Sequence, residues 1–597
     1  MHNKKEKNSF SSGIFMRMRK ILFIIIVFVL GFAAQAADFK FAVLGDSQLH
    51  NPDVFESLVR EVELLKPDFV VQVGDMIHGY TYEPGQIRGE WARFKTQIAP
   101  LSMPFYPVPG NHDVTTSPME AIYEEVWGRD RFYYSFNHKG SHFIILDTDF
   151  RLHYGVVTPE QMDWLSLDLE ESRTAEHTFL FMHQPLWRDK QSNWGDLRSL
   201  LAKYPRVRVI FAGHTHEYCF EVVDGIKTFI INSSGQINHE APAVGYFFQA
   251  LLVSVNGDDL MEAVIPAGSI KPPDYVNRQE RTRAGPYFIP PTGGQILDPA
   301  DKELDYVYSF PLKNRTWEMN VYTVRWVTPN PAFTVEPLEQ AVLLAPGRTE
   351  DVYVRLKAPS RRFEYYSLPY AFIETYYNTL RGESIILRSR HDLSIPRKAK
   401  VRFTSKPPWI DGILDDTAWQ SADVITDFQV TKAGDPADVQ TWVRTLYDEN
   451  NFYIGVHCEE PNPEDLVAFA SGTIPFTWGD DDVEIFLDVN HDMRTYDRAF
   501  VNSAAATFNS MPEKGICKPW YDHAVHIGKD YWAAEFRMPF KDLGFEDTPT
   551  SATVWGFNVR RHRQKPERVQ SDWQKMQNVP YEPWRFGVLQ FVKDHKE

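Results

Sequence analysis

Five short segments of the chain place metal-ligand residue types directly after hydrophobic runs. They read GDSQ, GDMIH, GNHD, MHQP and GHTH, and they contain Asp46, Gln48, Asp75, His78, Asn111, His112, His183, His214 and His216. Taken singly, an Asp or His in such a place is more often a turn former, a helix cap or a hydrogen-bonded core residue. Five segments in series favour one shared site, because ligands of open α/β folds bind beyond the carboxyl ends of the strands.

The residue types of these segments suit divalent cations. Mixed His, Asp and Asn ligands are typical of sites for Mn, Fe or Zn. Two such cations about 3.5–4 Å apart clamp a phosphoryl group and generate hydroxide from bound water. We expect one carboxylate to bridge the two cations, because a bridging anion offsets their mutual repulsion. The pattern therefore predicts a dinuclear metal site with phosphoester-hydrolysing chemistry.

The order of the motifs over residues 38–265 resembles that of the calcineurin-like metallophosphoesterases. The resemblance implies an α/β fold in which a β-sandwich is flanked by helices, with the site at one edge of the sheets. It implies that Asp75 bridges the two metals and that His112 contacts the phosphate and protonates the leaving group. The other implied ligands are Asp46, Gln48 and His216 for one metal, and Asn111, His183 and His214 for the other.

The first motif departs from the family pattern, in which an Asp-x-His is usual. Here it reads Asp46-Ser47-Gln48. An amide oxygen is a harder and weaker donor than imidazole, so we expect Gln48 to favour Mn or Fe over Zn.

Substrate contacts are expected from the loops above the site. Among several polar and aromatic residues there, His78 and Arg188 are the predicted substrate-binding residues, because an Arg can fork onto a phosphate. A packed surface loop is the alternative for each.

Strands that alternate with helices must position these motifs, which indicates a layered α/β domain over residues 37–265. Helices are expected over 52–65, with Asn51 as N-cap and Pro52 in the first turn, and from Pro159 onward, with Thr158 as N-cap. No GxGxxG follows a strand, so nothing indicates dinucleotide binding. The predicted strands are 39–44, 69–73, 105–108, 142–146, 178–182 and 207–212.

The second half of the chain has a different pattern. Residues 266–304 are rich in Pro and Gly and are interpreted as a linker. Residues 305–395 alternate apolar and polar residues, which predicts a small Ig-like β-sandwich. Residues 396–597 contain many short strand patterns separated by turn signals, which indicates a second all-β sandwich.

Several segments between residues 400 and 594 resemble family 9 carbohydrate-binding modules. These are IDGILDDTAW, WGDDDVEIFLD, WGFNVRR and FGVLQF. The resemblance implies a sugar site at Trp478, Glu484 and Asn558, where a ring stacks on a pyranose and polar groups bind its hydroxyls. Arg560 and Arg561 stand where a second aromatic is expected. A sandwich that only stabilises or spaces the enzyme is the alternative.

An acidic run, Asp480-Asp481-Asp482, precedes the strand pattern that contains Glu484. Carboxylate oxygens in such a run are ligands for Ca²⁺, which makes calcium a candidate cofactor of this region. A solvated turn is the alternative interpretation.

Residues 1–36 are interpreted as a signal peptide. A basic stretch precedes the apolar run Ile21–Phe32, and Ala34-Gln35-Ala36 is a small-x-small cleavage signature. The run is short for a bilayer span, so we expect export to the periplasm or the cell surface with no stable membrane span after cleavage. An uncleaved anchor is the alternative. Cys219, Cys458 and Cys517 are too few for a disulfide scaffold.

The predicted function is that of a secreted dinuclear-metal phosphoesterase acting on phosphate mono- or diesters. A net charge of −17 argues against a nucleic-acid polymer as partner, because the phosphates would be repelled. The expected partners are a phosphate ester and a sugar or polysaccharide, in the setting of carbohydrate catabolism. One alternative is a carbohydrate-binding surface protein with a residual phosphoesterase domain. Another is an enzyme whose C-terminal module holds it on a phosphorylated polysaccharide.

Overall fold

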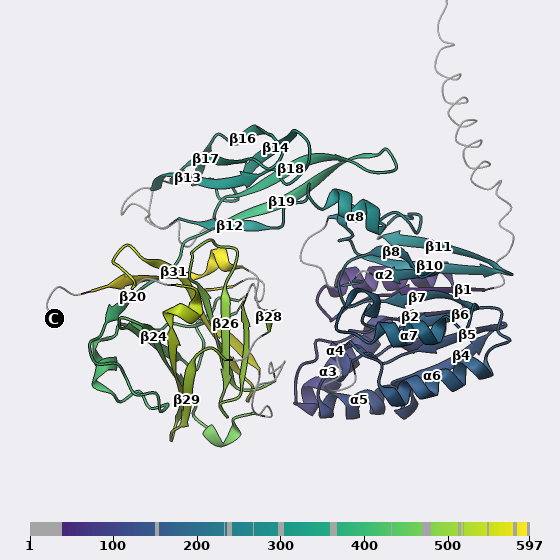
Figure 1. Cartoon of the computed structure of the whole chain (residues 1–597), viewed down its shortest axis with the longest axis horizontal. Coiled ribbons are helices and arrows are strands. Elements are labelled where there is room, and N and C mark those ends of the chain that lie inside the picture. Colours follow the sequence, from purple (N-terminus) through teal and green to yellow (C-terminus); the bar gives the residue numbers. More distant parts are fainter. Residues whose placement is uncertain are drawn as a thin grey trace, which may run out of the picture.

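The computed structural model has three β-rich parts (Figure 1), which we call the N-terminal domain (39–266), the middle domain (292–394) and the C-terminal domain (398–593). Among the described residues, no helix combines the length and apolarity that crossing a membrane requires. The structure describes residues 39–149, 155–231, 233–235, 241–266, 268–296, 304–358, 367–431, 433–468, 479–511, 515–516, 519–545, 548–566, 568–576 and 582–593.

Two sheets form the centre of the N-terminal domain. The first has the order β11-β10-β1-β2-β3 and the second the order β4-β5-β6-β7-β9-β8. The strands of the first sheet are β1 (Phe39–Leu44), β2 (Phe69–Gln72), β3 (Phe105–Pro107), β10 (Gln249–Asn256) and β11 (Asp259–Pro266). Those of the second are β4 (Tyr134–His138), β5 (Ser141–Ile145), β6 (Thr178–Phe181), β7 (Val207–Ala212), β8 (Cys219–Val223) and β9 (Ile226–Ile230).

Alternation along each strand builds two kinds of core. In β1, Phe41 and Val43 face the layer between the sheets, whereas Ala42 and Leu44 face the helices. Helices α2 (Pro52–Leu65), α3 (Pro84–Ile98) and α5 (Ser117–Trp127) cover the first sheet. Helices α6 (Pro159–Glu171) and α7 (Trp194–Leu201) cover the second. The expected α/β fold, a β-sandwich flanked by helices, is therefore confirmed.

The two predicted helix caps differ in outcome. The Thr158 side chain accepts a hydrogen bond from Gln161 N at 3.3 Å and caps α6 as expected. Asn51 stands at the N-cap of α2, but its side chain makes no capping bond. Its Nδ2 instead donates to Gly235 O at 2.7 Å. The predicted N-cap position of Asn51 is thus confirmed, but its side chain contacts a distant loop and not the first turn of the helix.

The middle domain consists of two packed sheets, with the orders β12-β19-β18-β14-β16 and β13-β17-β15. Alternate residues of these strands meet in one core, as the sequence pattern predicts. The strands are β12 (Thr292–Gln295), β13 (Leu304–Lys313), β14 (Asn320–Val327), β15 (Thr334–Glu336), β16 (Glu339–Leu344), β17 (Thr349–Ala358), β18 (Tyr370–Asn378) and β19 (Ser384–Ser394).

The stretch 266–304, interpreted from sequence as a linker, contains helix α8 (Arg278–Ala284) and strand β12. Two glycines of β12 are needed for close packing and not for flexibility. A Cβ on Gly293 would lie 2.2 Å from Trp584 Cδ1, and a Cβ on Gly294 would lie 1.8 Å from Tyr308 Oη. The Gly-rich composition therefore reflects packing against the C-terminal and middle domains.

The C-terminal domain is built on one continuous path of paired strands around a large apolar core. Its central pair, β25 with β31, places Asp482 opposite His562, Glu484 opposite Arg560, and Phe486 opposite Asn558. The strands are β20 (Lys398–Phe403), β21 (Val424–Ile425), β22 (Gln429–Val430), β23 (Thr441–Tyr447), β24 (Asn451–Glu459), β25 (Asp482–Asp488), β26 (Asp497–Asn502), β27 (Thr507–Met511), β28 (Gly515–Ile516), β29 (Asp522–Ile527), β30 (Tyr531–Pro539), β31 (Val554–Arg563), β32 (Val569–Asp572) and β33 (Gly587–Val592).

Candidate metal centre

The seven predicted metal ligands come together at one edge of the two N-terminal sheets. Each lies just after the carboxyl end of a strand: Asp46 and Gln48 after β1, Asp75 after β2, Asn111 after β3, His183 after β6, and His214 and His216 after β7. Two groups with ligand atoms within 4.8 Å of one another form around Asp75, which belongs to both. The first group adds His183 and His214, and the second adds Asp46 and His216.

His183 and Asn111 lie at the centre of the first group. His183 Nδ1 is 2.7 Å from Val73 O, so this nitrogen donates to the carbonyl and Nε2 faces the centre. His183 Nε2 lies 3.2 Å from Asp75 Oδ1 and 3.0 Å from Asn111 Oδ1. His214 Nδ1 lies 3.0 Å from the same Asn111 oxygen. These nitrogen and oxygen atoms face one another at short distances. A cation between them would relieve the repulsion of their lone pairs.

The second group contains the Gln48 that departs from the family pattern. His216 Nε2 is 3.0 Å from Asp46 Oδ2. Gln48 Nε2 donates to Asp75 Oδ2 at 2.9 Å and lies 3.4 Å from His216 Nε2. A half-turn of the amide would present its oxygen at the same position, since the two ends of the group are nearly isosteric. Gln48 is therefore placed where a ligand oxygen is required.

A glycine precedes the ligand in four motifs, and in three of them another ligand approaches the backbone too closely for a side chain. A Cβ on Gly74 would lie 2.4 Å from His183 Nδ1, and one on Gly110 would lie 2.4 Å from Asp75 Oδ1. A Cβ on Gly213 would lie 2.6 Å from Asp46 Oδ1. The GD, GN and GH pairs of the sequence thus have a steric cause.

The backbone at several ligands is in the left-handed region, which L-residues with a Cβ rarely adopt. Asp75 has a φ of 53° and His214 a φ of 70°. Buried Asp113 holds this geometry: its Oδ1 accepts from Met76 N at 2.9 Å and its Oδ2 from Gly110 N at 3.0 Å. Asp113 was not among the predicted site residues, although it completes the GNHD motif. Local strain stabilised by a buried carboxylate is typical of functional sites.

The electrostatics of the centre demand positive charge. Burial raises the pKa of Asp75, but the neighbouring His183, His112 and His214 outweigh burial and hold it well below its ordinary value. Burial lowers the pKa of His183, but the carboxylates of Asp75, Asp149 and Asp46 outweigh that effect and raise it well above its ordinary value. Protons on the imidazoles would satisfy this demand, and divalent cations would replace them. The donor set and its charge therefore fit a dinuclear metal centre.

His112 lies beside the cluster, with both its backbone and its ring held in place. Its backbone N donates to Asp75 Oδ1 at 2.9 Å, and its Nδ1 lies 2.6 Å from His78 O. The other ring nitrogen, Nε2, lies 3.9 Å from Asp75 Oδ2 and faces the centre. Burial lowers the pKa of His112, and the charge of Asp75 opposes that shift. Nε2 is thus the atom that can exchange a proton with a bound substrate.

The two predicted substrate-binding residues lie in different surroundings. His78 is next to the centre, and burial together with the charges of His50 and His112 lowers its pKa to about 3. Arg188 Nη1 donates to Glu217 Oε1 at 2.7 Å, and its Nη2 donates to Glu221. The Arg188 guanidinium is therefore already bound by two carboxylates, whereas His78 contributes its carbonyl to His112. Substrate contact by either residue stays a prediction.

Tyr80 is one of the polar and aromatic residues expected above the site, but it was not among the chosen site residues. Its hydroxyl accepts a hydrogen bond from Asn111 Nδ2 at 2.6 Å, which aims the Asn111 oxygen at the two histidines. Its ring packs edge-on against His112, with centroids 4.5 Å apart. Its place two positions after GDMIH indicated a residue near the site, but not a contact with Asn111.

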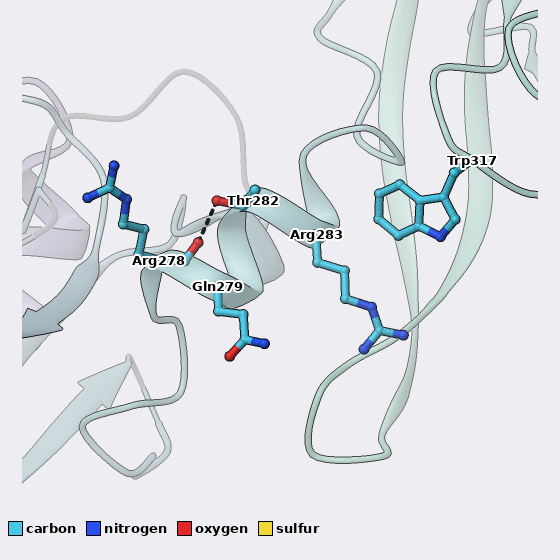
Figure 2. Close-up of a pocket in the computed structure, with 5 residues that line it drawn as sticks. All are labelled: Arg278, Gln279, Thr282, Arg283 and Trp317. Carbon is cyan, nitrogen blue, oxygen red and sulfur yellow. Dashed lines mark hydrogen bonds between the residues drawn. The ribbon is translucent and has the colours of Figure 1, made fainter.

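Figure 2 shows a surface hollow that contains none of the predicted metal ligands. It is lined by α8 and by the middle-domain Trp317. Within α8, Thr282 Oγ1 donates to Arg278 O at 2.8 Å. None of the residues that line the hollow is a predicted site residue.

In the C-terminal domain, Glu484 forms a buried ion pair with Arg498. Asn558 uses its amide on the backbone of Gln574: Nδ2 donates to the carbonyl and Oδ1 accepts from the N–H, both at 2.9 Å. Trp478 lies outside the described residues. The sugar-binding roles of these three residues stay predictions.

The acidic run of the C-terminal domain does not converge on one point. Asp481 uses both carboxylate oxygens on backbone N–H groups, those of Val467 at 2.7 Å and Gln564 at 3.1 Å. Asp482 instead groups with Glu484 and His562, with ligand-type atoms within 4.8 Å of one another. Calcium binding by the acidic run stays a prediction.

Comparison with known protein families supports the two resemblances noted in the sequence. Residues 39–218 match the family model of the calcineurin-like phosphoesterases, and residues 410–593 match that of the carbohydrate family 9 binding domain-like proteins. Both resemblances inferred from the sequence motifs are thereby confirmed.

Individual relatives are distant. The chain is 27% identical over 206 residues to "Probable purple acid phosphatase 20" of Arabidopsis thaliana, covering 30% of this chain and 45% of the relative. It is 26% identical over 178 residues to the 3',5'-cyclic adenosine monophosphate phosphodiesterase CpdA of Escherichia coli, covering 28% of this chain and 62% of the relative. The chain thus spans about half the length of the curated relatives it matches.

Among solved structures, one similar protein is a family 9 carbohydrate-binding module from Caldicellulosiruptor kristjanssonii in complex with cellotriose. It is 18% identical with a TM-score of 0.27, covering 34% of this chain and 96% of the module.

Proposed function

We propose that this chain is an exported dinuclear-metal phosphoester hydrolase acting on phosphate mono- or diesters. The observation that carries the proposal is the convergence of seven ligand-type residues from five strand ends around Asp75, in a setting that demands positive charge. At three of the motifs, a glycine leaves the space that a neighbouring ligand side chain occupies. The match of residues 39–218 to the calcineurin-like phosphoesterases supports the same activity.

In phosphoester hydrolysis, the residues of the centre would have separate roles. When bound, two divalent cations would supply the Lewis acidity that activates water and neutralises phosphate charge. Asp75 lies where it can bind both, and His183 and His214 present ring nitrogens toward it. Tyr80 orients the Asn111 amide. His112, held by the His78 carbonyl, would pass a proton from Nε2 to the leaving-group oxygen.

A second candidate function is carbohydrate binding by the C-terminal domain. The family match of residues 410–593 favours it. The domain would then direct the hydrolase to phosphorylated glycans, with Trp478, Glu484 and Asn558 contacting sugar. In a glycan array, Glu484→Gln should lose binding that the wild-type chain has. Failure of the wild-type chain to bind any glycan would contradict this second function.

Activity toward two simple esters tests the main proposal. The chain from Ala37 onward would be stripped of metal and assayed with p-nitrophenyl phosphate and bis-p-nitrophenyl phosphate, with Mn, Fe, Zn or Mg restored. We expect metal-dependent turnover, and the ratio of the two rates would distinguish a monoesterase from a diesterase. No turnover with any of these metals would contradict the proposal and favour a carbohydrate-binding protein with a residual phosphoesterase domain.

A further inference from the structure

The C-terminal domain contacts the N-terminal domain at a short segment beside the metal centre, which we call the docking loop (residues 79–83). Gly479, just before β25, packs against Tyr82: a Cβ on Gly479 would lie 2.6 Å from Tyr82 Cδ2 and 3.5 Å from Tyr80 O. Lys565, just after β31, lies 3.8 Å from Glu83, measured from Nζ to Oε1. The ends of the two central strands of the C-terminal domain therefore meet the same loop.

Opposite charges of the two domains also lie near one another beside this packing. Arg568, on the same turn as Lys565, is influenced by the carboxylates of Glu90 on α3 and Asp482 at the start of β25, which oppose the lowering of its pKa by burial. Glu90 Oε2 in turn accepts from Gly79 N, the first residue of the docking loop, at 2.9 Å. The charge of Arg568 is therefore felt at the carboxylate that holds the start of the loop.

The opposite side of the docking loop is part of the metal centre. Gly79 packs so closely on His112 that a Cβ there would lie 1.8 Å from His112 O. Tyr80 binds Asn111 through its hydroxyl and packs against the His112 ring. Thr81 O accepts from Thr116 Oγ1 at 2.9 Å, which ties the loop to α5. A displacement of the loop would thus reach a metal ligand and the proton donor.

We propose that the C-terminal domain is a fixed structural part of the phosphoester site and not a module on a flexible tether. By docking on residues 79–83 it positions Tyr80, and through Tyr80 it positions Asn111 and His112. Gly479, Lys565 and Arg568 are positioning residues in this account, because they act through the loop and not on the substrate. The expected effect of docking on the reaction rate rests on the proposed phosphoesterase function. The docking contact itself does not depend on that function.

Gly479→Leu is the variant that tests the docking. The added side chain would overlap the Tyr82 ring and push the loop away from the C-terminal domain. We expect faster hydrogen exchange across residues 79–83, where Gly79 N–H is protected by Glu90. With p-nitrophenyl phosphate we expect kcat to fall about tenfold with little change in KM, since misplacement of Asn111 and His112 affects the chemical step.

A second substitution should reverse the first. In Gly479→Leu/Tyr82→Ala the leucine occupies the space that the ring leaves, so exchange and kcat should return to within about twofold of the Tyr82→Ala variant. Lys575→Glu is the matched control. Lys575 lies in the C-terminal domain, where its Nζ donates to Ala433 O at 3.1 Å and not to a residue of the docking loop.

The outcomes separate the two proposals. Unchanged exchange and unchanged kcat in Gly479→Leu would overturn the docking, because a tethered module would leave a small soluble ester unaffected. Faster exchange with unchanged kcat would overturn the positioning role. If the wild-type chain hydrolyses no ester with any metal, the proposed function fails, whereas hydrogen exchange still decides whether the C-terminal domain holds the loop.

Discussion

Two buried clusters of carboxylate and imidazole groups differ in where their counter-charge comes from. Around Asp75 in the N-terminal domain, histidines are the groups that offset the carboxylates, and the pKa of His183 is raised well above its ordinary value. Around Glu484 in the C-terminal domain, Arg498 and Arg560 supply positive charge, and burial together with those guanidinium groups lowers the pKa of His562 to about 3, although Glu484 opposes the shift.

This difference in counter-charge indicates which of the two clusters favours a metal ion. Arginine remains charged under all ordinary conditions, so the carboxylates near Glu484 have permanent partners and a second cation would be repelled. Among the described residues, no arginine partners the carboxylates of the cluster around Asp75. Glycines leave room close to these carboxylates. The same residue types therefore favour a dinuclear metal centre in one domain and an internal ion-pair network in the other. In that network, Glu484 Oε2 and His562 Nε2 have no hydrogen-bond partner among the described residues.

The largest expected effect is the loss of activity in Asp75→Asn. Removing the carboxylate shared by both ligand groups should lower kcat/KM about a thousandfold or more, equivalent to about 4 kcal/mol of transition-state stabilisation. Metal content, measured by plasma mass spectrometry, should fall with it, whereas Asp482→Asn should keep the wild-type metal content. If Asp75→Asn keeps its turnover and its metal content, the cluster around Asp75 is not the metal centre that distinguishes the two domains.

The next effect is on stability and concerns the C-terminal cluster. Glu484→Ala leaves the buried Arg498 without its carboxylate, which should lower the free energy of unfolding by about 3–5 kcal/mol. Chemical denaturation followed by tryptophan fluorescence would measure it. Glu464→Ala, an exposed carboxylate of the same domain, is the control and should change stability by less than about 0.5 kcal/mol. Equal effects of the two substitutions would show that the Glu484–Arg498 pair does not stabilise the domain.

The third prediction concerns which metal ion the N-terminal cluster prefers, and it tests the role of Gln48. Gln48→His replaces an amide with imidazole, a softer and stronger donor, and should tighten Zn²⁺ binding about tenfold relative to Mn²⁺. Titration calorimetry of the metal-free chain with each ion would measure the change. Two tightly bound Zn ions in the unmodified chain would refute the role given to Gln48.

The smallest effect is expected for Tyr80→Phe. The change removes the hydroxyl that accepts from Asn111 Nδ2 at 2.6 Å and leaves a buried donor without its partner. We expect kcat to fall about three- to tenfold, equivalent to about 1 kcal/mol, with the packing of the ring on His112 retained. Steady-state kinetics with p-nitrophenyl phosphate would show it, and a change in KM alone would argue against a link through Asn111.

Features fixed by local pattern could be predicted from the sequence. Strand ends at Asp46 and Asp75, the helix cap at Thr158 and the order of the motifs all follow from short-range periodicity and residue type. Features that depend on distant contacts could not. Asp113 and Tyr80 act on neighbours across the fold, and the Asn51 amide binds Gly235 instead of its own helix.

The same limit applies to the second half of the chain. Nothing in the spacing of GPYFIPPTGG shows that Gly293 and Gly294 pack against Trp584 and Tyr308. The docking of Gly479 on Tyr82 likewise joins residues almost four hundred positions apart.

Anomalous X-ray diffraction from crystals grown with Mn²⁺ tests the central claim most directly. We predict two anomalous peaks about 3.5–4 Å apart beside Asp75, with no peak at the cluster of Asp482, Glu484 and His562. A peak at the C-terminal cluster, or none beside Asp75, would contradict the account.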